Sequence, residues 1–452
     1  MNINVQYRCD ICGNTQPKGD KCQCCGSESL KKEECVKENC QPPLSSNLEV
    51  VIIGGGIASL SVIRCLIEKG IHSITLICKE KHFPYYRTAI PKILFDPPFC
   101  SNPQFFIEQK KFYQKNNINI LLGFTVKSID LKKSIVITEK DLVRQEVHFS
   151  KLVLAVGGEP NKPPFIPQSY SNDIIPIHSA ADMEAINSLF ETRIIKQIAI
   201  IGAGLSGIEI SNALRRKSAK VTVTLIEIAD RILPRQLSKT SSKIFMDVLL
   251  KNGIQLKLNS QIKAILCDES TKIIEFSNGE RMACDLICYS CGIKSSVQLA
   301  QSIGCKINHG IIVNEYMQTN ISNVFACGDC CEFNGRCYGN WTDAMKQGIV
   351  CGKAIAGEFT KYIYTLMPYF VFSFIGVYSV GIIEGESILK QNGNEVMEIF
   401  LKSGCIVGGN LLGKIITKVQ RELVTSIERK TEGKEAQLLI EKWKTYFNSI
   451  TF

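Results

Sequence analysis

Four cysteines close to the N-terminus have the types and spacing of a metal site. They form two C-x2-C pairs, Cys9 with Cys12 and Cys22 with Cys25, and each pair is followed by glycine. Four thiolates at this spacing complete a tetrahedral shell for zinc or for a single iron. Because Cys24 precedes Cys25 directly, it could replace Cys22 in the second pair. We predict a four-cysteine metal site and leave that one ligand open.

A glycine-rich turn at residues 50–56 (VVIIGGG) could bind phosphate. Four β-branched residues predict a buried parallel strand, and an amphipathic stretch and a second apolar strand at 73–78 follow. In such a unit, Gly54 makes the turn and Gly56 lets a pyrophosphate approach the helix N-terminus. Ser59 stands where a third glycine is usual. These residues predict a dinucleotide site.

The same arrangement recurs at residues 197–213 with a complete G-x-G-x-x-G, formed by Gly202, Gly204 and Gly207. The strand that follows ends in Glu227. A carboxylate there binds both hydroxyls of a ribose and repels a 2′-phosphate, so it favours NADH over NADPH. Arg231 weakens this preference slightly.

The duplication extends beyond the turns. A meander and a glycine-ended strand follow each unit: KLVLAVGG at 151–158, which contains Gly157, and DLICYSCG at 285–292. This repeat predicts an α/β fold with two Rossmann-like dinucleotide-binding domains. In the first unit, Glu80 is the carboxylate available for a ribose, since Cys78 takes the usual position of the acid.

Composition restricts the class of protein. The chain has 452 residues, 45% of them hydrophobic and 21% charged, which predicts about three globular domains. Its 21 cysteines, without a visible signal peptide, argue against a disulfide scaffold, and most of the later ones indicate apolar fillers in a reducing compartment. Basic residues are scattered despite the net charge of +10, which argues against nucleic acid. The apolar run at 369–383 is too short to span a membrane. We expect a cytoplasmic protein.

The N-terminal cysteine stretch resembles the rubredoxin-type knuckle at the end of rubrerythrins, on the motif Y-x-C-x-x-C-G followed by K-C-x-x-C-G. Its adjacent cysteines also resemble desulforedoxin. Both families hold iron on four thiolates, so the resemblance implies iron at this site, although a zinc knuckle that only folds the segment would look similar. Cys35 and Cys40, in the polar stretch that follows, are not expected to be ligands.

The main body resembles the flavoprotein reductases of the pyridine nucleotide-disulfide oxidoreductase superfamily. The two glycine turns, the LVLAVGG strand and a late A-x-G-D motif that contains Gly328 and Asp329 carry this resemblance, over about residues 48–430. It implies that the first unit binds FAD and the second binds NAD(P)H, with Asp329 on the ribityl and phosphate region of the flavin.

The nearest subfamily is implied by the stretch PYYRTAIPK at 84–92, which includes Arg87. It resembles the P-Y-x-R-P-x-L-[SP]-K stretch of rubredoxin, ferredoxin and nitrite reductase flavoproteins, and residues 79–98 contain no redox cysteine. In those proteins the lysine, here Lys92, lies beside the flavin and pairs with the glutamate of G-x-x-G-x-E, here Glu209. Trp341 falls in the segment that lines the flavin edge, although a core tryptophan is nearly as good an interpretation.

These observations predict an FAD-dependent NADH oxidoreductase that passes electrons to a rubredoxin-like or other small acidic redox protein, or to its own iron centre. There are two alternatives. One is an NADH oxidase, and the other is a flavoprotein whose zinc knuckle docks a partner subunit. The C-terminal part resembles the family's interface domain, which is compatible with a homo-oligomer. The expected domains are a knuckle at 1–30, a linker at 31–47, the FAD domain at 48–159 and 293–364, the NAD domain at 160–292 and the interface domain at 365–452.

Overall fold

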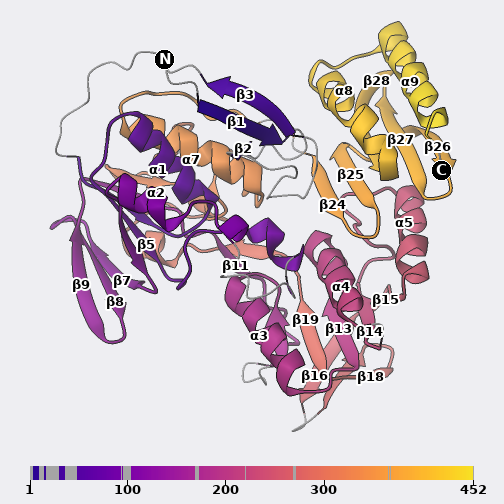
Figure 1. Cartoon of the computed structure of the whole chain (residues 1–452), viewed down its shortest axis with the longest axis horizontal. Helices are drawn as coiled ribbons and strands as arrows, with labels where there is room; N and C mark the ends of the chain where they lie inside the picture. Colours follow the sequence, from indigo (N-terminus) through magenta and orange to yellow (C-terminus); the bar gives the residue numbers. More distant parts are fainter. Residues whose placement is uncertain are drawn as a thin grey trace.

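The computed structural model describes residues 4–9, 15–16, 30–35, 48–92, 94, 103–167, 173–218, 220–267, 271–364, 366 and 368–450 (Figure 1). Before residue 48, and at Lys92 and Phe372, it describes the backbone only. Cys12, Cys22 and Cys25 lie outside the described residues, and Cys9 ends a strand. No helix in the described part is long and apolar enough to cross a membrane.

The first unit is built on a five-stranded parallel sheet, in the order β22-β10-β4-β5-β6. Helices α1 (Ile57–Glu68) and α7 (Trp341–Ile355) pack against each other, and α2 (Lys110–Lys115) lies nearby. An antiparallel sheet of β7 (Thr125–Asp130), β8 (Ile135–Lys140) and β9 (Val143–His148) extends from the unit (Figure 1). The five strands are β4 (Val50–Ile53), β5 (Ile74–Cys78), β6 (Asn119–Leu122), β10 (Lys151–Leu154) and β22 (Val324–Ala326).

The second unit repeats this plan with the order β12-β19-β13-β14-β15. It carries α3 (Ala180–Thr192), α4 (Leu205–Lys217) and α5 (Lys239–Lys251). Its strands are β12 (Ile174–Pro176), β13 (Gln197–Ile201), β14 (Thr222–Ile226), β15 (Ile254–Lys257) and β19 (Leu286–Tyr289), and its meander is β16 (Ile262–Cys267), β17 (Lys272–Phe276) and β18 (Arg281–Cys284). The predicted Rossmann-like fold class is therefore confirmed.

Two short strands connect the units. The chain leaves the first unit through β11 (Gly158–Pro160) and returns through β20 (Ile293–Ser295), and these pair antiparallel. The returning chain forms α6 (Gln298–Ser302), β21 (Ile311–Ile312) and β23 (Cys331–Glu332) before α7. The second unit is thus an insertion in the first.

The C-terminal part is an antiparallel sheet in the order β24-β25-β28-β27-β26, accompanied by α8 (Ile416–Glu428) and α9 (Gly433–Asn448) (Figure 1). On α9, Ile440, Trp443 and Phe447 are buried and Leu439 is partly buried, so this helix packs through one face. The apolar run at 369–383 forms two strands of this sheet. The strands are β24 (Tyr369–Phe372), β25 (Gly376–Gly381), β26 (Glu386–Asn392), β27 (Glu395–Lys402) and β28 (Cys405–Leu412).

An N-terminal antiparallel sheet has the order β2-β1-β3, with β1 (Asn4–Cys9), β2 (Thr15–Gln16) and β3 (Leu30–Cys35). The third strand occupies residues that the sequence assigns mostly to a linker, because LKKEEC lacks an apolar period. Its strand character comes from backbone pairing with β1, from Asn4 opposite Cys35 to Cys9 opposite Leu30.

Candidate active site

A cavity of about 510 Å³ lies where the two units meet. Both glycine turns reach it: Gly56 lines it from the first unit, and Leu205 and Ser206 line it from the second. Asp329 and Trp341 complete its wall on the side of the first unit. The carboxyl ends of parallel sheets are where nucleotides bind in such folds, so this cavity is where the two predicted nucleotide sites would meet.

The first glycine turn is shaped for close backbone approach. Gly54 has φ +115°, and a Cβ there would lie 2.1 Å from the carbonyl oxygen of Ala155. Gly56 begins α1 without a side-chain cap, and nothing lies within 4 Å of a Cβ built on it. Ser59, at the position of the third glycine, donates its hydroxyl to the Gly54 carbonyl at 2.5 Å. This open, uncapped helix N-terminus fits a pyrophosphate.

The second turn has the same geometry. Gly202 has φ +100°, and its Cβ would lie 2.4 Å from the carbonyl oxygen of Ser290. Gly204 begins α4 uncapped and faces open space, whereas a Cβ on Gly207 would lie 2.0 Å from the Gly202 oxygen. Each glycine therefore has the role that the motif predicts, and this turn also fits a pyrophosphate.

Glu227 follows β14 beside the second turn. Its carboxylate accepts hydrogen bonds from the backbone N–H of Ala203 at 2.9 Å and of Ala229 at 3.0 Å. Arg231 donates hydrogen bonds to Asp230 Oδ1 at 2.8 Å and to the Pro234 carbonyl at 3.1 Å. Glu227 therefore places a negative charge beside the second turn, and Arg231 already binds two other acceptors. This suits a ribose with free hydroxyls better than one with a 2′-phosphate.

Glu80 and Arg87 are brought together in the structure. Arg87 Nη2 bonds Glu80 Oε1, while Tyr85 donates its hydroxyl to Glu80 Oε2 at 2.6 Å. Burial opposes ionisation of Glu80, but the Arg87 charge and these two bonds outweigh it and lower the carboxyl pKa. Of the two, Arg87 lines the cavity, and Glu80 stands behind it.

Asp329 lies at the cavity wall, after the positive-φ residue Gly328. Burial raises the pKa of Asp329 to about 6, although the charge of Arg87 partly offsets the rise. Gly157, another predicted cofactor residue, has φ +69° and lines the same wall. The conformations of both glycines let the backbone pass directly beside the cavity.

Glu209 projects from α4 and lines the cavity. Its predicted partner, Lys92, is the last residue of η1 (Arg87–Lys92), and the Lys92 side chain is outside the described residues. The backbone of η1 packs against α4, so the two elements of the predicted pair are neighbours. Trp341 also lines the cavity and stacks on Tyr86, with ring centroids 5.4 Å apart at 24°.

His178 and Cys291 are among the cavity residues that the sequence did not single out. His178 lies at the junction of β12 and α3, and burial, then the charge of Arg87, lowers its pKa to about 4. Cys291 lines the second turn, and burial raises its pKa to about 11, so it remains a thiol at neutral pH. Neither has a sequence signal beyond the strand that precedes it.

The later cysteines that we interpreted as fillers are buried free thiols: Cys65, Cys78, Cys284, Cys288 and Cys305. Cys78 is close-packed against the first turn, since a Cβ on Gly55 would lie 2.8 Å from its sulfur. Burial raises the pKa of Cys78 to about 12. These thiols are buried in the packing, as expected of small apolar fillers.

The family model described as pyridine nucleotide-disulphide oxidoreductase matches residues 48–348. The chain belongs to this family. The predicted enzyme class, an FAD-dependent NAD(P)H oxidoreductase, is thereby confirmed.

Relatives within this oxidoreductase family differ in name and in length. A protein named NADH oxidase from Methanocaldococcus jannaschii is 31% identical over 330 residues, covering 70% of this chain and 71% of that protein. NADH-rubredoxin oxidoreductase from Clostridium acetobutylicum is 27% identical over 343 residues, covering 76% and 84%. The chain spans only 38% of the nitrite reductase from Bacillus subtilis, to which it is 29% identical.

Solved structures share the fold. The NAD-dependent persulfide reductase from A. fulgidus superimposes with a TM-score of 0.76 at 24% identity, over 85% of this chain and 77% of that one. NADH:rubredoxin oxidoreductase from Clostridium acetobutylicum gives 0.71 at 24% identity, over 86% and 98%. These similarities confirm the architecture of the oxidoreductase family.

Proposed function

We propose that the protein is a cytoplasmic FAD-dependent NADH reductase that delivers electrons singly to an iron centre on Cys9, Cys12, Cys22 and Cys25, or to a small acidic rubredoxin-like protein. The observation that carries this proposal is the single cavity that both pyrophosphate turns reach. Residues 79–98, where a redox cysteine of this family would lie, contain none, so electrons would leave the flavin directly. Bound FAD and NADH would supply hydride transfer, and iron on four thiolates would accept single electrons.

The side chains around the cavity have separate tasks in this proposal. Gly56 and Gly204 would offer backbone N–H groups to the two pyrophosphates, and Asp329 would hold the flavin's sugar chain. Lys92, paired with Glu209, would place positive charge beside the flavin ring and favour its reduced, anionic state. Cys291, as a protonated thiol, does not act as a nucleophile.

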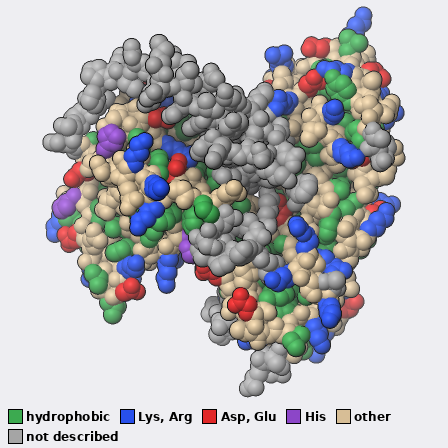
Figure 2. Space-filling model, in the orientation of Figure 1, with side chains coloured by type: hydrophobic (Ala, Val, Ile, Leu, Met, Phe, Trp, Pro, Cys, Tyr) green, Lys and Arg blue, Asp and Glu red, His purple; other side chains and the backbone are tan. Residues whose placement is uncertain are grey.

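The relatives named NADH-rubredoxin oxidoreductase and rubredoxin-NAD(+) reductase support an iron acceptor. The charge distribution supports an acidic protein partner, because the first 46 residues carry six basic and six acidic side chains and leave the net charge of +10 on the rest. Figure 2 shows that the basic side chains are spread over the visible face rather than gathered in one field.

Two full-length variants test the electron path. Cys22→Ser should lose its metal, while Cys24→Ser should keep it, since four thiolates already fill the tetrahedral shell. We expect NADH to reduce the flavin in both variants and to reduce the iron only in Cys24→Ser. Elemental analysis and anaerobic stopped-flow absorbance measure this. If Cys24→Ser loses the metal and Cys22→Ser keeps it, Cys24 is the ligand.

A second candidate, NADH oxidase, is favoured by the name of the relative from Methanocaldococcus jannaschii. Oxygen consumption by the wild-type protein distinguishes the two. Oxygen uptake equal to NADH consumption, with the iron left oxidised, would establish the oxidase. Zinc instead of iron in the pure protein would mean that the knuckle docks a partner.

A further inference from the structure

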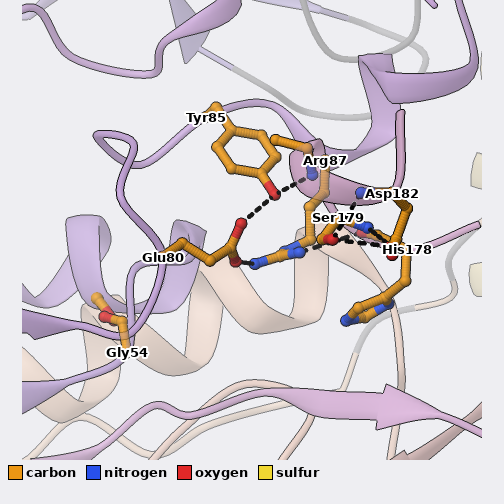
Figure 3. A network of polar contacts seen from close by, with 9 residues as sticks. Gly54, Glu80, Tyr85, Arg87, His178, Ser179 and Asp182 are labelled. Atoms are coloured by element: carbon orange, nitrogen blue, oxygen red, sulfur yellow. Dashed lines mark hydrogen bonds and ion pairs between the residues drawn. The ribbon is translucent and has the colours of Figure 1, made fainter. Parts of the chain in front are cut away.

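A buried polar network joins the two units at one side of the cavity (Figure 3). We name it the interdomain clamp and define it as Glu80, Tyr85 and Arg87 of the first unit with His178 and Ala180 of the second. In Figure 3 the Tyr85 hydroxyl and the Arg87 guanidinium both point towards the Glu80 carboxylate, and the start of α3 lies beyond them.

Tyr85 is the centre of the interdomain clamp. Its side chain is only 3% exposed, and its ring stacks on Phe105 with centroids 4.7 Å apart. The hydroxyl donates to Glu80 Oε2 at 2.6 Å and accepts from the backbone N–H of Ala180 at 3.0 Å. One oxygen therefore connects the acid of the first unit to the first residue of α3.

Arg87 makes a parallel connection. One guanidinium nitrogen bonds Glu80 Oε1, and Nη1 donates to the His178 carbonyl at 3.1 Å. The charge of Arg87 also acts on Asp329, the acid at the cavity wall. Arg87 thus connects the predicted flavin site to the loop that begins α3.

The start of α3 is closed by its own capping interactions and makes a further contact with the first unit. Ser179 and Asp182 form a reciprocal capping box, in which Asp182 Oδ2 accepts from the Ser179 N–H at 2.6 Å. A second contact from the same loop, His82 Nε2 to Glu184 Oε1 at 3.2 Å, reaches the next turn of the helix. The second unit is therefore fixed to residues 80–87 by its helix N-terminus.

We propose that Tyr85 and Arg87 are positioning residues for hydride transfer, which set the spacing between the two nucleotide sites by holding α3 against Glu80. This inference rests on the proposed function. Each pyrophosphate turn lies within its own unit and contains no clamp residue, so loosening the clamp leaves both turns intact and changes the separation between them. Hydride transfer is far more sensitive to that separation than binding is.

The test compares flavin-bound, full-length Tyr85→Phe with wild type. The variant keeps the ring and its stack on Phe105 but loses both hydrogen bonds. We expect the limiting rate of flavin reduction at saturating NADH to fall by about tenfold or more. Flavin content and the half-saturating NADH concentration should stay within about twofold of wild type, because neither pyrophosphate turn changes.

Two further variants accompany it. Arg87→Lys keeps the charge but loses the fork that reaches both Glu80 and His178, so it should slow reduction similarly. Tyr113→Phe is the matched control, because the Tyr113 hydroxyl is buried in the same unit with no hydrogen-bond partner among the described residues. It should behave as wild type.

Amide hydrogen exchange gives a readout independent of turnover. Peptides covering residues 177–186 should exchange faster in Tyr85→Phe than in wild type, with NADH absent. Wild-type reduction rates in both clamp variants, unchanged exchange, or loss of flavin from Tyr85→Phe would each overturn the proposal. A wild-type protein that NADH fails to reduce would instead refute the proposed function, and the exchange result would still test the clamp.

Discussion

Glu227 shows how a single residue sets nucleotide preference by its position. Its carboxylate is fixed by two backbone N–H groups at the end of β14, and Arg231 is engaged by Asp230 and Pro234. A 2′-phosphate brought to this place would meet a fixed negative charge, and Arg231 is not free to neutralise it.

Replacing Glu227 with Ala should therefore lower the preference for NADH. We expect the kcat/KM for NADH divided by the kcat/KM for NADPH to fall by about tenfold, because one charge contact is lost. Steady-state kinetics with both nucleotides measures the ratio. Lys251→Ala, an exposed change at the far end of α5, is the control. A wild-type enzyme that already prefers NADPH would contradict the role of Glu227.

His178 predicts a pH dependence of stability. Its pKa falls from 6.5 to about 4 on folding, so the unfolded chain binds the proton more tightly. The contribution of neutral His178 to the free energy of unfolding is complete above pH 6.5 and is lost as the pH falls towards 4. Asp329, whose pKa rises to about 6, contributes in the opposite direction: its stabilisation is present at low pH and is lost as the pH rises through 6.

The difference between wild type and His178→Gln isolates the histidine, because Asp329 is present in both. We expect the unfolding free energy of wild type, relative to the variant, to drop by about 1–2 kcal/mol between pH 7 and 4.5, allowing for partial exposure of the ring. Urea unfolding at several pH values measures it. A difference that is constant with pH would show that His178 titrates normally.

At the scale of elements, α1 and α7 approach closely because α7 carries glycines on the facing side. A Cβ on Gly348 would lie 2.3 Å from the Ala58 carbonyl oxygen, and one on Gly352 would lie 2.7 Å from the Cys65 Cβ. Since α1 begins at Gly56, the packing of α7 fixes the helix N-terminus that faces the cavity.

Gly348→Ala should destabilise the protein by about 1–3 kcal/mol, because the added methyl group meets backbone that cannot yield. This outweighs the gain of about 1 kcal/mol in helix propensity. Flavin content should fall as α1 shifts. Denaturant unfolding and flavin absorbance measure both effects, with Ile349→Ala, at a half-exposed neighbouring position, as control. A variant as stable as wild type would mean that the helices can separate without cost.

The elements that the sequence predicted best are those with a local signal. Both glycine turns need a positive φ or open space at particular residues, so glycine at those positions predicts the turns. Both units repeat the same strand pattern, so that pattern predicts the two sheets. The interdomain clamp could not be predicted, since Tyr85 and Ala180 are 95 positions apart and the motif at 84–92 that contains Tyr85 does not indicate its partner. The sequence did not predict β3 because its residues are mostly charged and have no apolar pattern. Only its pairing with β1 defines it as a strand.

At the scale of the whole molecule, a buried carboxylate joins the second unit to the C-terminal sheet. Glu398 of β27 is 3% exposed and accepts hydroxyl hydrogen bonds from Ser238 at 2.5 Å and Ser241 at 2.6 Å. Both serines lie at the N-terminus of α5, which favours the negative charge. The C-terminal sheet is thus attached to this unit by a specific polar contact.

Ser241→Ala should lower the free energy of unfolding by about 1–3 kcal/mol, because a buried charged acceptor loses one donor. Thr240→Ala, exposed on the same turn, is the control and should change little. Differential scanning calorimetry would show the loss. Equal melting temperatures of Ser241→Ala and Thr240→Ala would indicate that a water molecule replaces the Ser241 hydroxyl as donor to Glu398.

The insertion of one unit within the other also has a consequence for synthesis on the ribosome. The second sheet is complete once Tyr289 has emerged, but the first still lacks β22 at Val324–Ala326 and the covering helix that ends at Ile355. Domains fold as they are completed during translation. We expect nascent chains arrested after about residue 330, with a ribosome tunnel holding the last few tens of residues, to resist protease in the second unit while the first stays cleavable. The unit whose synthesis starts later would then be finished earlier, and the flavin site would be the last of the two to form.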